Sequence, residues 1–113
     1  MPADANLPFC YLTTAGRTTG KPHRIEIWFA QHERTLYMLA GGRERADWVA
    51  NLVVQPDCMI ELGAHTFTAT ARILQEGADE DELARTLVHD KYAQGNDLAQ
   101  WRVEALPVAF DLD

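Results

Sequence analysis

The chain has 113 residues, 47% of them apolar, which suits one packed domain and excludes an enzyme with a separate dinucleotide-binding domain. Its formal charge of -7 is uneven, because residues 1–56 carry six basic and five acidic side chains whereas residues 57–113 carry four and twelve. We therefore expect one domain over residues 1–113 that repels nucleic acid and attracts small anions only through its first half.

Several kinds of chemistry are excluded by the residues present. The sequence contains no serine, so a serine nucleophile is impossible. Cys10 and Cys58 lie in apolar runs without CxxC spacing, which argues against a disulfide framework and against cysteine catalysis. The four histidines show neither HxH nor HExxH spacing, so we expect no metal. We find no signal peptide and no apolar run of membrane-spanning length, and therefore expect a cytoplasmic protein.

The first half of the chain predicts three strands and a helix. Residues 8–14 predict a strand, and a turn rich in glycine follows at 15–22. Residues 23–30 alternate as a half-buried strand, and 35–40 predict a third strand that completes a meander. The helical stripe of 43–54 ends before a proline. This stripe comprises Ala46, Val49, Ala50 and Val53, extended by Trp48 and Leu52.

Residues 79–92 predict a second helix. Asp79 and Glu82 have the spacing of a capping box, and acidic residues suit the amino end of a helix. The residues expected to be buried are Leu83, Leu87 and Val88.

The remaining strands set the fold class. Residues 58–63 and 65–74 predict a hairpin across Gly63 and Ala64. Residues 106–112 predict a closing strand, which Pro107 confines to an edge position or to a strand start. About six mostly antiparallel strands with two principal helices inserted between them indicate an α+β fold, built as a small, partly open barrel.

The turn TTAGRTTGKPHR at 13–24 is the first candidate binding site. It combines backbone amides next to glycines, threonine hydroxyls and the cations Arg17, Lys21, His23 and Arg24, as a phosphate or carboxylate group requires. It is not a nucleotide-triphosphatase loop, because its glycines are too close and Pro22 stands where Ser or Thr would hold magnesium. The alternative is a hairpin turn with solvated cations.

Two further segments are candidates. On the second predicted strand Glu26 lies between Arg24 and Trp28, and this face would meet a ligand, a helix or a second subunit. The helix start at 41–52 suits an anion, and Trp48 offers a flat surface to a ring. The alternative for this helix start is a core tryptophan with solvated arginines.

Four segments occur together in the order and spacing of a known family: LTTAGRTTGKPHRIEIWF, LYMLAGGRERADWVANL, QPDCMIELG and ALPVAFDL. From about Leu12 to Leu112 the chain resembles the deazaflavin-dependent nitroreductases, also called the F420H2-dependent quinone reductase family. The resemblance implies a split β-barrel related to flavin-binding folds, often a homodimer. It also implies coenzyme F420 as cofactor and hydride transfer to a small organic acceptor, namely a quinone, an enone or a nitro compound.

The resemblance also implies site residues. The family's tail-binding GRxxGxP turn, with the residue after it, falls on Gly16, Arg17, Thr18, Thr19, Gly20, Lys21, Pro22 and His23. The ring-binding strand end and helix fall on Leu39, Ala40, Gly41, Gly42, Trp48 and Asn51. Tyr92 and Glu26 are candidates for proton delivery or substrate placement. Relatives that reduce nitroaromatic drugs often have a Ser-Lys pair where this chain has Ala40, Gly41 and Gly42, and they carry several tyrosines of which only Tyr92 is retained.

Three alternatives share these features. Because a deazaflavin cofactor supplies the hydride, the protein needs no nucleophile of its own, which accounts for the sparse catalytic signatures. An FMN-dependent reductase of the same fold is one alternative, and a non-catalytic flavin- or haem-binding carrier is another. The third is a dimerisation module whose exposed tryptophans form an interface.

Overall fold

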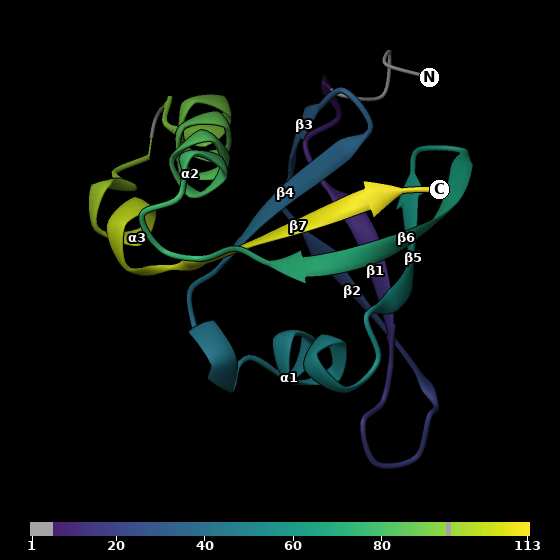
Figure 1. Ribbon diagram of the computed structural model, residues 1–113. Coiled ribbons are helices and arrows are strands. Elements are labelled where there is room, and N and C mark those ends of the chain that lie inside the picture. The colour runs from purple at the N-terminus through teal and green to yellow at the C-terminus, as the bar shows by residue number, and fades with distance from the viewer. Residues whose placement is uncertain (1–5, 95) are drawn as a thin grey trace.

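The computed structural model describes residues 6–94 and 96–113, and within them seven strands form one antiparallel sheet (Figure 1). The strands are β1 (Cys10–Ala15), β2 (Pro22–Ile27), β3 (Ala30–His32), β4 (Thr35–Ala40), β5 (Asp57–Leu62), β6 (His65–Ile73) and β7 (Leu106–Leu112). Their order in the sheet is β2-β1-β5-β6-β7-β4-β3. Only Trp28 and Phe29 separate the two edge strands along the chain, so the sheet curls into a half-barrel. The predicted α+β split barrel is confirmed.

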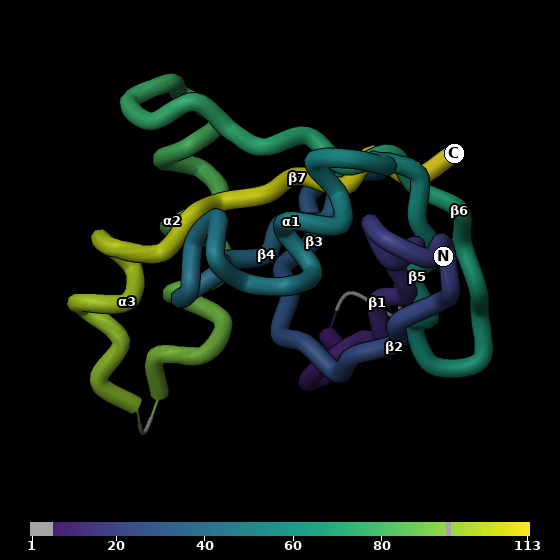
Figure 2. Tube along the Cα trace, turned by 90° about the horizontal axis from the view of Figure 1, so that it is seen from below, coloured from purple at the N-terminus to yellow at the C-terminus, as the bar shows by residue number. Residues whose placement is uncertain are grey.

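The helices lie at two different places around this sheet. A 3₁₀ turn at Arg43–Arg45 leads into α1 (Asp47–Val54), whereas α2 (Asp79–Tyr92) and α3 (Ala99–Glu104) lie together on the other side (Figure 1). Seen from below, α1 lies between the helices α2 and α3 and the strands β1 and β2 (Figure 2). Among the described residues, no helix is both long and apolar enough to span a membrane.

The predicted three-stranded meander is wrong. The predicted strand at 23–30 is divided into β2, which pairs with β1, and β3, which pairs with β4. The break falls at Phe29, whose N–H donates to the Tyr92 hydroxyl at 3.1 Å and whose carbonyl accepts from Lys91 Nζ at 2.9 Å. Side chains of α2 therefore take the backbone bonds that a neighbouring strand would otherwise make.

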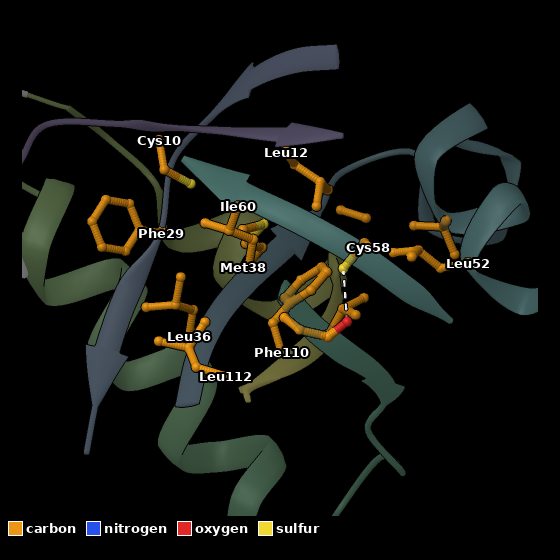
Figure 3. Packing of buried hydrophobic residues seen from close by; sticks show 14 of the residues in the cluster. Cys10, Leu12, Phe29, Leu36, Met38, Leu52, Cys58, Ile60, Phe110 and Leu112 are labelled. Carbon is orange, nitrogen blue, oxygen red and sulfur yellow. Dashed lines mark hydrogen bonds between the residues drawn. The ribbon is translucent and has the colours of Figure 1, made fainter. Parts of the chain in front are cut away.

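The main apolar core fills the inside of the curl (Figure 3). Phe29 and Phe110 are fully buried there, together with side chains from five strands and α1. β7 lies in the middle of the sheet between β6 and β4, so of the two positions predicted for Pro107 the structure has the strand start.

Both cysteines are free and buried in the barrel. The Cys58 Sγ contacts the Ala69 carbonyl at 3.6 Å (Figure 3). Burial raises the pKa of each thiol to about 12, so both stay protonated at neutral pH. Neither meets the requirements of a cysteine nucleophile, as the sequence predicted.

The two predicted helices differ from the structure in detail. The α-helix of 43–54 begins only at Asp47, and its buried face is Val49, Asn51 and Leu52, while Val53 is 63% exposed. The capping box of α2 is wrong, because Ala78 is the N-cap residue and no side chain caps the helix. α3 was not predicted.

The buried residues of α2 also differ from the expectation. Val88 is fully buried, but Leu83 and Leu87 are only partly buried. Asp81 and Arg85 take the protected positions instead, as a buried ion pair at 2.8 Å. Apolar periodicity could not reveal them, because charged residues are buried only when paired.

Candidate functional site

A cleft of about 450 Å³ lies between α1 and the glycine turn, which we define as residues 16–21. The lining residues are Thr14, Gly16, Arg17, Thr18, Thr19, His23, Ile25, Asp47, Trp48 and Asn51. Its volume is within the usual range of small-ligand sites.

The glycine turn is closed by two short backbone hydrogen bonds. Gly16 N–H donates to the Lys21 carbonyl at 2.8 Å, and Gly20 N–H donates to the Gly16 carbonyl at 2.7 Å. Gly20 has a φ of +76°, a conformation that favours glycine. A Cβ on Gly16 would lie 2.7 Å from His23 Nε2, so glycine at this position leaves space for the imidazole beside the cleft.

Asn51 joins the glycine turn to α1. The residue is 3% exposed, and its Oδ1 accepts from the Arg17 backbone N–H at 3.1 Å and from Arg17 Nη1 at 2.8 Å. Its Nδ2 donates to the buried Thr14 hydroxyl at 3.0 Å. Both ends of the amide are therefore bonded, which holds the Arg17 guanidinium at the wall of the cleft.

Arg17 also contacts the first residue of α1. Its Nη2 lies 3.3 Å from Asp47 Oδ1, and its Nη1 lies 3.5 Å from the Asp47 carbonyl oxygen. The Arg17 and Asp47 side chains are 43% and 88% exposed. The cleft thus carries a fixed cation whose charge is countered by an exposed carboxylate.

The structure brings together part of the predicted site. Arg17, Thr18, Thr19, His23, Trp48 and Asn51 line the cleft. Gly20 and Pro22 face a separate hollow next to Met59, and Lys21 is exposed on the same turn. Ala40, Gly41 and Gly42 lie outside the cleft, where Gly41 is close to the Trp101 ring.

Two cleft residues were not singled out from the sequence, namely Ile25 and Asp47, whereas Thr14 belongs to the predicted turn at 13–24. A signal for Asp47 exists in the sequence, because it stands four residues before Asn51 and therefore shares its helix face. Ile25 and His23 are likewise two residues apart on one strand and share a face.

Tyr92 and Glu26 do not line the cleft. The Tyr92 ring stacks on Trp28 with centroids 4.2 Å apart, and its hydroxyl donates to the Pro8 carbonyl at 2.8 Å. Burial raises the pKa of Tyr92. Glu26 is exposed on β2, opposite Tyr11 of β1. Their roles in proton delivery or substrate placement stay predictions.

Comparison with known proteins identifies the family. A sequence model of the F420H(2)-dependent quinone reductases matches residues 4–113. The chain belongs to this family. The predicted resemblance is confirmed, and with it the class of the protein as an oxidoreductase whose reductant is reduced coenzyme F420. No curated protein sequence matches the chain.

Solved structures share the fold of this family member at low sequence identity. An F420-H2 dependent reductase, FDR-A, matches with a TM-score of 0.76 and 21% identity, covering 95% of each chain. A protein described as a domain-swapped dimer matches at 0.75 and 22%, covering 95% of this chain and 81% of the other. HutZ, the heme storage protein from Vibrio cholerae, matches at 0.75 and 16%, covering 94% and 82%.

The donor set of the cleft fits the cofactor of this family. A guanidinium, threonine hydroxyls and an imidazole are suitable partners for phosphate and carboxylate groups, and the Trp48 side chain offers an aromatic surface. Within residues 6–94 and 96–113, no three His, Cys, Asp or Glu side chains gather as metal ligands.

Proposed function

We propose that the chain binds coenzyme F420 in the cleft and catalyses hydride transfer from its reduced form to a small organic acceptor, namely a quinone, an enone or a nitro compound. The observation that carries this proposal is the Arg17 guanidinium, which Asn51 fixes beside a wall of hydroxyl groups and an aromatic ring. Family membership supports the cofactor class, and the cation and hydroxyl groups of the cleft support binding of the anionic tail there.

The side chains of the cleft would divide this work. Arg17, Thr18, Thr19 and His23 would bind the phosphate and glutamate groups, with Lys21 adding positive charge from the same turn. Trp48 would cover one face of the ring and exclude water from it. For hydride transfer the protein has to position the cofactor and the acceptor, and it needs no nucleophile of its own. Buried, protonated thiols and the lack of serine are therefore compatible with catalysis.

A binding panel tests the cofactor. Equilibrium dialysis against F420, FMN, FAD and haem should retain F420 most tightly, because only F420 combines a phosphate with a glutamate chain. Preferential retention of FMN would support the FMN-dependent alternative. Oxidation of reduced F420 in the presence of quinone, enone and nitro acceptors then separates a catalyst from a carrier.

Charge variants test the tail site. Arg17→Ala and Lys21→Ala each remove a charged hydrogen-bond donor to the tail, so each should weaken F420 binding by about 1.5 to 3 kcal/mol and reduce its salt dependence. Arg45→Ala is the matched control, because it removes one exposed positive charge that does not line the cleft. Equal affinity in Arg17→Ala and the control would contradict the assignment.

A non-catalytic carrier is the second candidate. It is favoured by the likeness to HutZ, a heme storage protein, together with the His23 imidazole at the cleft, since histidine is a common haem ligand. A carrier would retain haem in the dialysis panel, and His23→Ala would abolish that retention and change the haem absorption spectrum.

Assembly forms the last part of the proposal. The likeness to a domain-swapped dimer supports a homodimer. Light scattering after gel filtration should give twice the mass of the 12.7 kDa chain. A mass of one chain over the working concentration range would contradict this assignment.

A further inference from the structure

The Asp47 carboxylate occupies one side of the cation that the proposed function assigns to ligand binding. Its Oδ1 lies 3.3 Å from Arg17 Nη2, and both residues line the cleft. A phosphate or carboxylate that binds through Arg17 Nη2 would compete with Asp47, because an N–H group that already donates to one carboxylate cannot donate fully to a second anion.

The position of Arg17 does not depend on that carboxylate. The guanidinium is also held by Asn51 Oδ1 at 2.8 Å, and the Arg17 backbone N–H donates to the same oxygen at 3.1 Å. Asn51 is buried and bonded to Thr14, so this support is rigid. Moving the Asp47 carboxylate away would therefore uncover the cation without releasing it.

Asp47 itself is free to move. Its side chain is 88% exposed and belongs to the first residue of α1, and an exposed ion pair contributes little net stability in water. Replacing this pair by a pair with a ligand anion costs little, whereas the same exchange at a buried pair would leave a charge unpaired.

We propose that Asp47 is a built-in competitor for the anionic tail of the ligand. Its carboxylate pairs with Arg17 in the free protein, is displaced when the ligand binds, and thereby sets both the affinity and the charge selectivity of the cleft. The inference rests on the proposed function, since it concerns the same cleft and the same cation.

The test compares Asp47→Asn with Glu44→Gln. Both variants remove one exposed acidic charge, but Glu44 pairs with Arg43 at 3.7 Å and does not line the cleft. Isothermal titration should show F420 binding about two- to fivefold tighter in Asp47→Asn than in the wild type, which corresponds to the strength of an exposed ion pair. Glu44→Gln should leave the affinity unchanged. Thermal unfolding should show that both variants are folded.

Two further measurements separate competition from other effects. The deazaflavin chromophore without its phosphate and glutamate tail should bind the wild type and Asp47→Asn equally. In an Arg17→Ala background the gain from Asp47→Asn should disappear, as a double-mutant cycle requires when the two residues act through their contact.

The outcomes also distinguish the inference from the proposed function. The inference is wrong, and the proposed function stands, if the wild type binds F420 and Asp47→Asn binds it no tighter. The same holds if Asp47→Asn increases the affinity for the tail-free chromophore as much as the affinity for F420. A gain that persists without Arg17 also overturns the inference. If neither protein binds F420, both proposals are wrong.

Discussion

The Arg17–Asp47 and Arg85–Asp81 ion pairs join the same two residue types in opposite environments. Arg17 and Asp47 meet at the cleft with side chains 43% and 88% exposed, whereas Arg85 and Asp81 meet under α3 with 7% and 8% exposed. In the second pair Asp81 also accepts from the Gly77 N–H at 2.9 Å, and Arg85 donates to the Arg102 carbonyl at 2.6 Å.

The difference shows how burial decides what an ion pair does. The buried Asp81–Arg85 pair joins the start of α2 to the end of α3. Removing either partner would leave the other charged group buried, with neither a counter-charge nor water to solvate it. The Arg17–Asp47 pair keeps access to water, so its partners can be exchanged for a ligand at small cost. An exposed ion pair therefore suits a binding site, whereas a buried ion pair suits a junction between helices.

The buried pair gives the largest expected effect. Asp81→Ala should lower the free energy of unfolding by about 3 to 5 kcal/mol, because it leaves the Arg85 guanidinium buried without its counter-charge. Asp47→Ala, the matched change at the cleft, should lower it by less than about 1 kcal/mol. Urea unfolding followed by circular dichroism measures both. Similar losses in the two variants would break the distinction between the pairs.

Asn51 sharpens the comparison because it is a buried group that supports the exposed pair. Asn51→Ala removes the bonds to Arg17 and to the buried Thr14 hydroxyl, so it should cost about 1 to 3 kcal/mol of stability and also weaken F420 binding. Asn96→Ala, which removes an exposed amide bonded to the Tyr92 carbonyl, is the control and should change neither quantity measurably. Loss of stability without loss of affinity would show that Arg17 needs no support from Asn51.

The sequence predicted local structure far better than contacts between residues that are far apart in the chain. Alternation and turn residues indicated nearly every strand, and the hairpin across Gly63 and Ala64 is confirmed by the pairing of Leu62 with His65. The break between β2 and β3 could not be predicted, because it depends on Tyr92 and Lys91, more than sixty residues away.

The candidate site shows the same limit. The composition of the glycine turn indicated an anion site, and the family resemblance assigned Trp48 and Asn51 to ring binding. The structure places both residues in the same cleft as the turn, which the sequence did not indicate. The pairing of Arg17 with Asp47 lay outside the prediction, because it joins residues 30 apart whose approach is set by the packing of α1 against β1. Short-range patterns contain no information about that packing.

Tyr92, the last residue of α2, is a polar group that lies away from the cleft. Its hydroxyl bonds to the Pro8 carbonyl and to the Phe29 backbone, away from the cleft, so we expect Tyr92→Phe to lower stability by about 0.5 to 1.5 kcal/mol and to leave turnover of reduced F420 unchanged. A loss of turnover of about 100-fold or more would instead identify Tyr92 as the proton donor. Steady-state kinetics and urea unfolding on the same samples separate these results.

The smallest expected effect comes from ion pairs of intermediate exposure. Arg72 bonds to Glu80 at 2.8 Å and to Asp111 at 2.5 Å, with the Arg72 side chain 43% exposed, and these bonds lower the pKa of both carboxyl groups. Because the folded pKa values lie below the unfolded ones, the carboxylates contribute stability above about pH 5 that is lost as the pH falls below about 4. Arg72→Gln should therefore lower the free energy of unfolding at pH 7 by less than about 1 kcal/mol in total, and the difference from the wild type should shrink toward pH 3. Arg45→Gln, which removes an exposed charge elsewhere, should show no such pH dependence. A difference that stays constant from pH 7 to pH 3 would mean that Arg72 stabilises the fold through its packing on the sheet instead of through its charge.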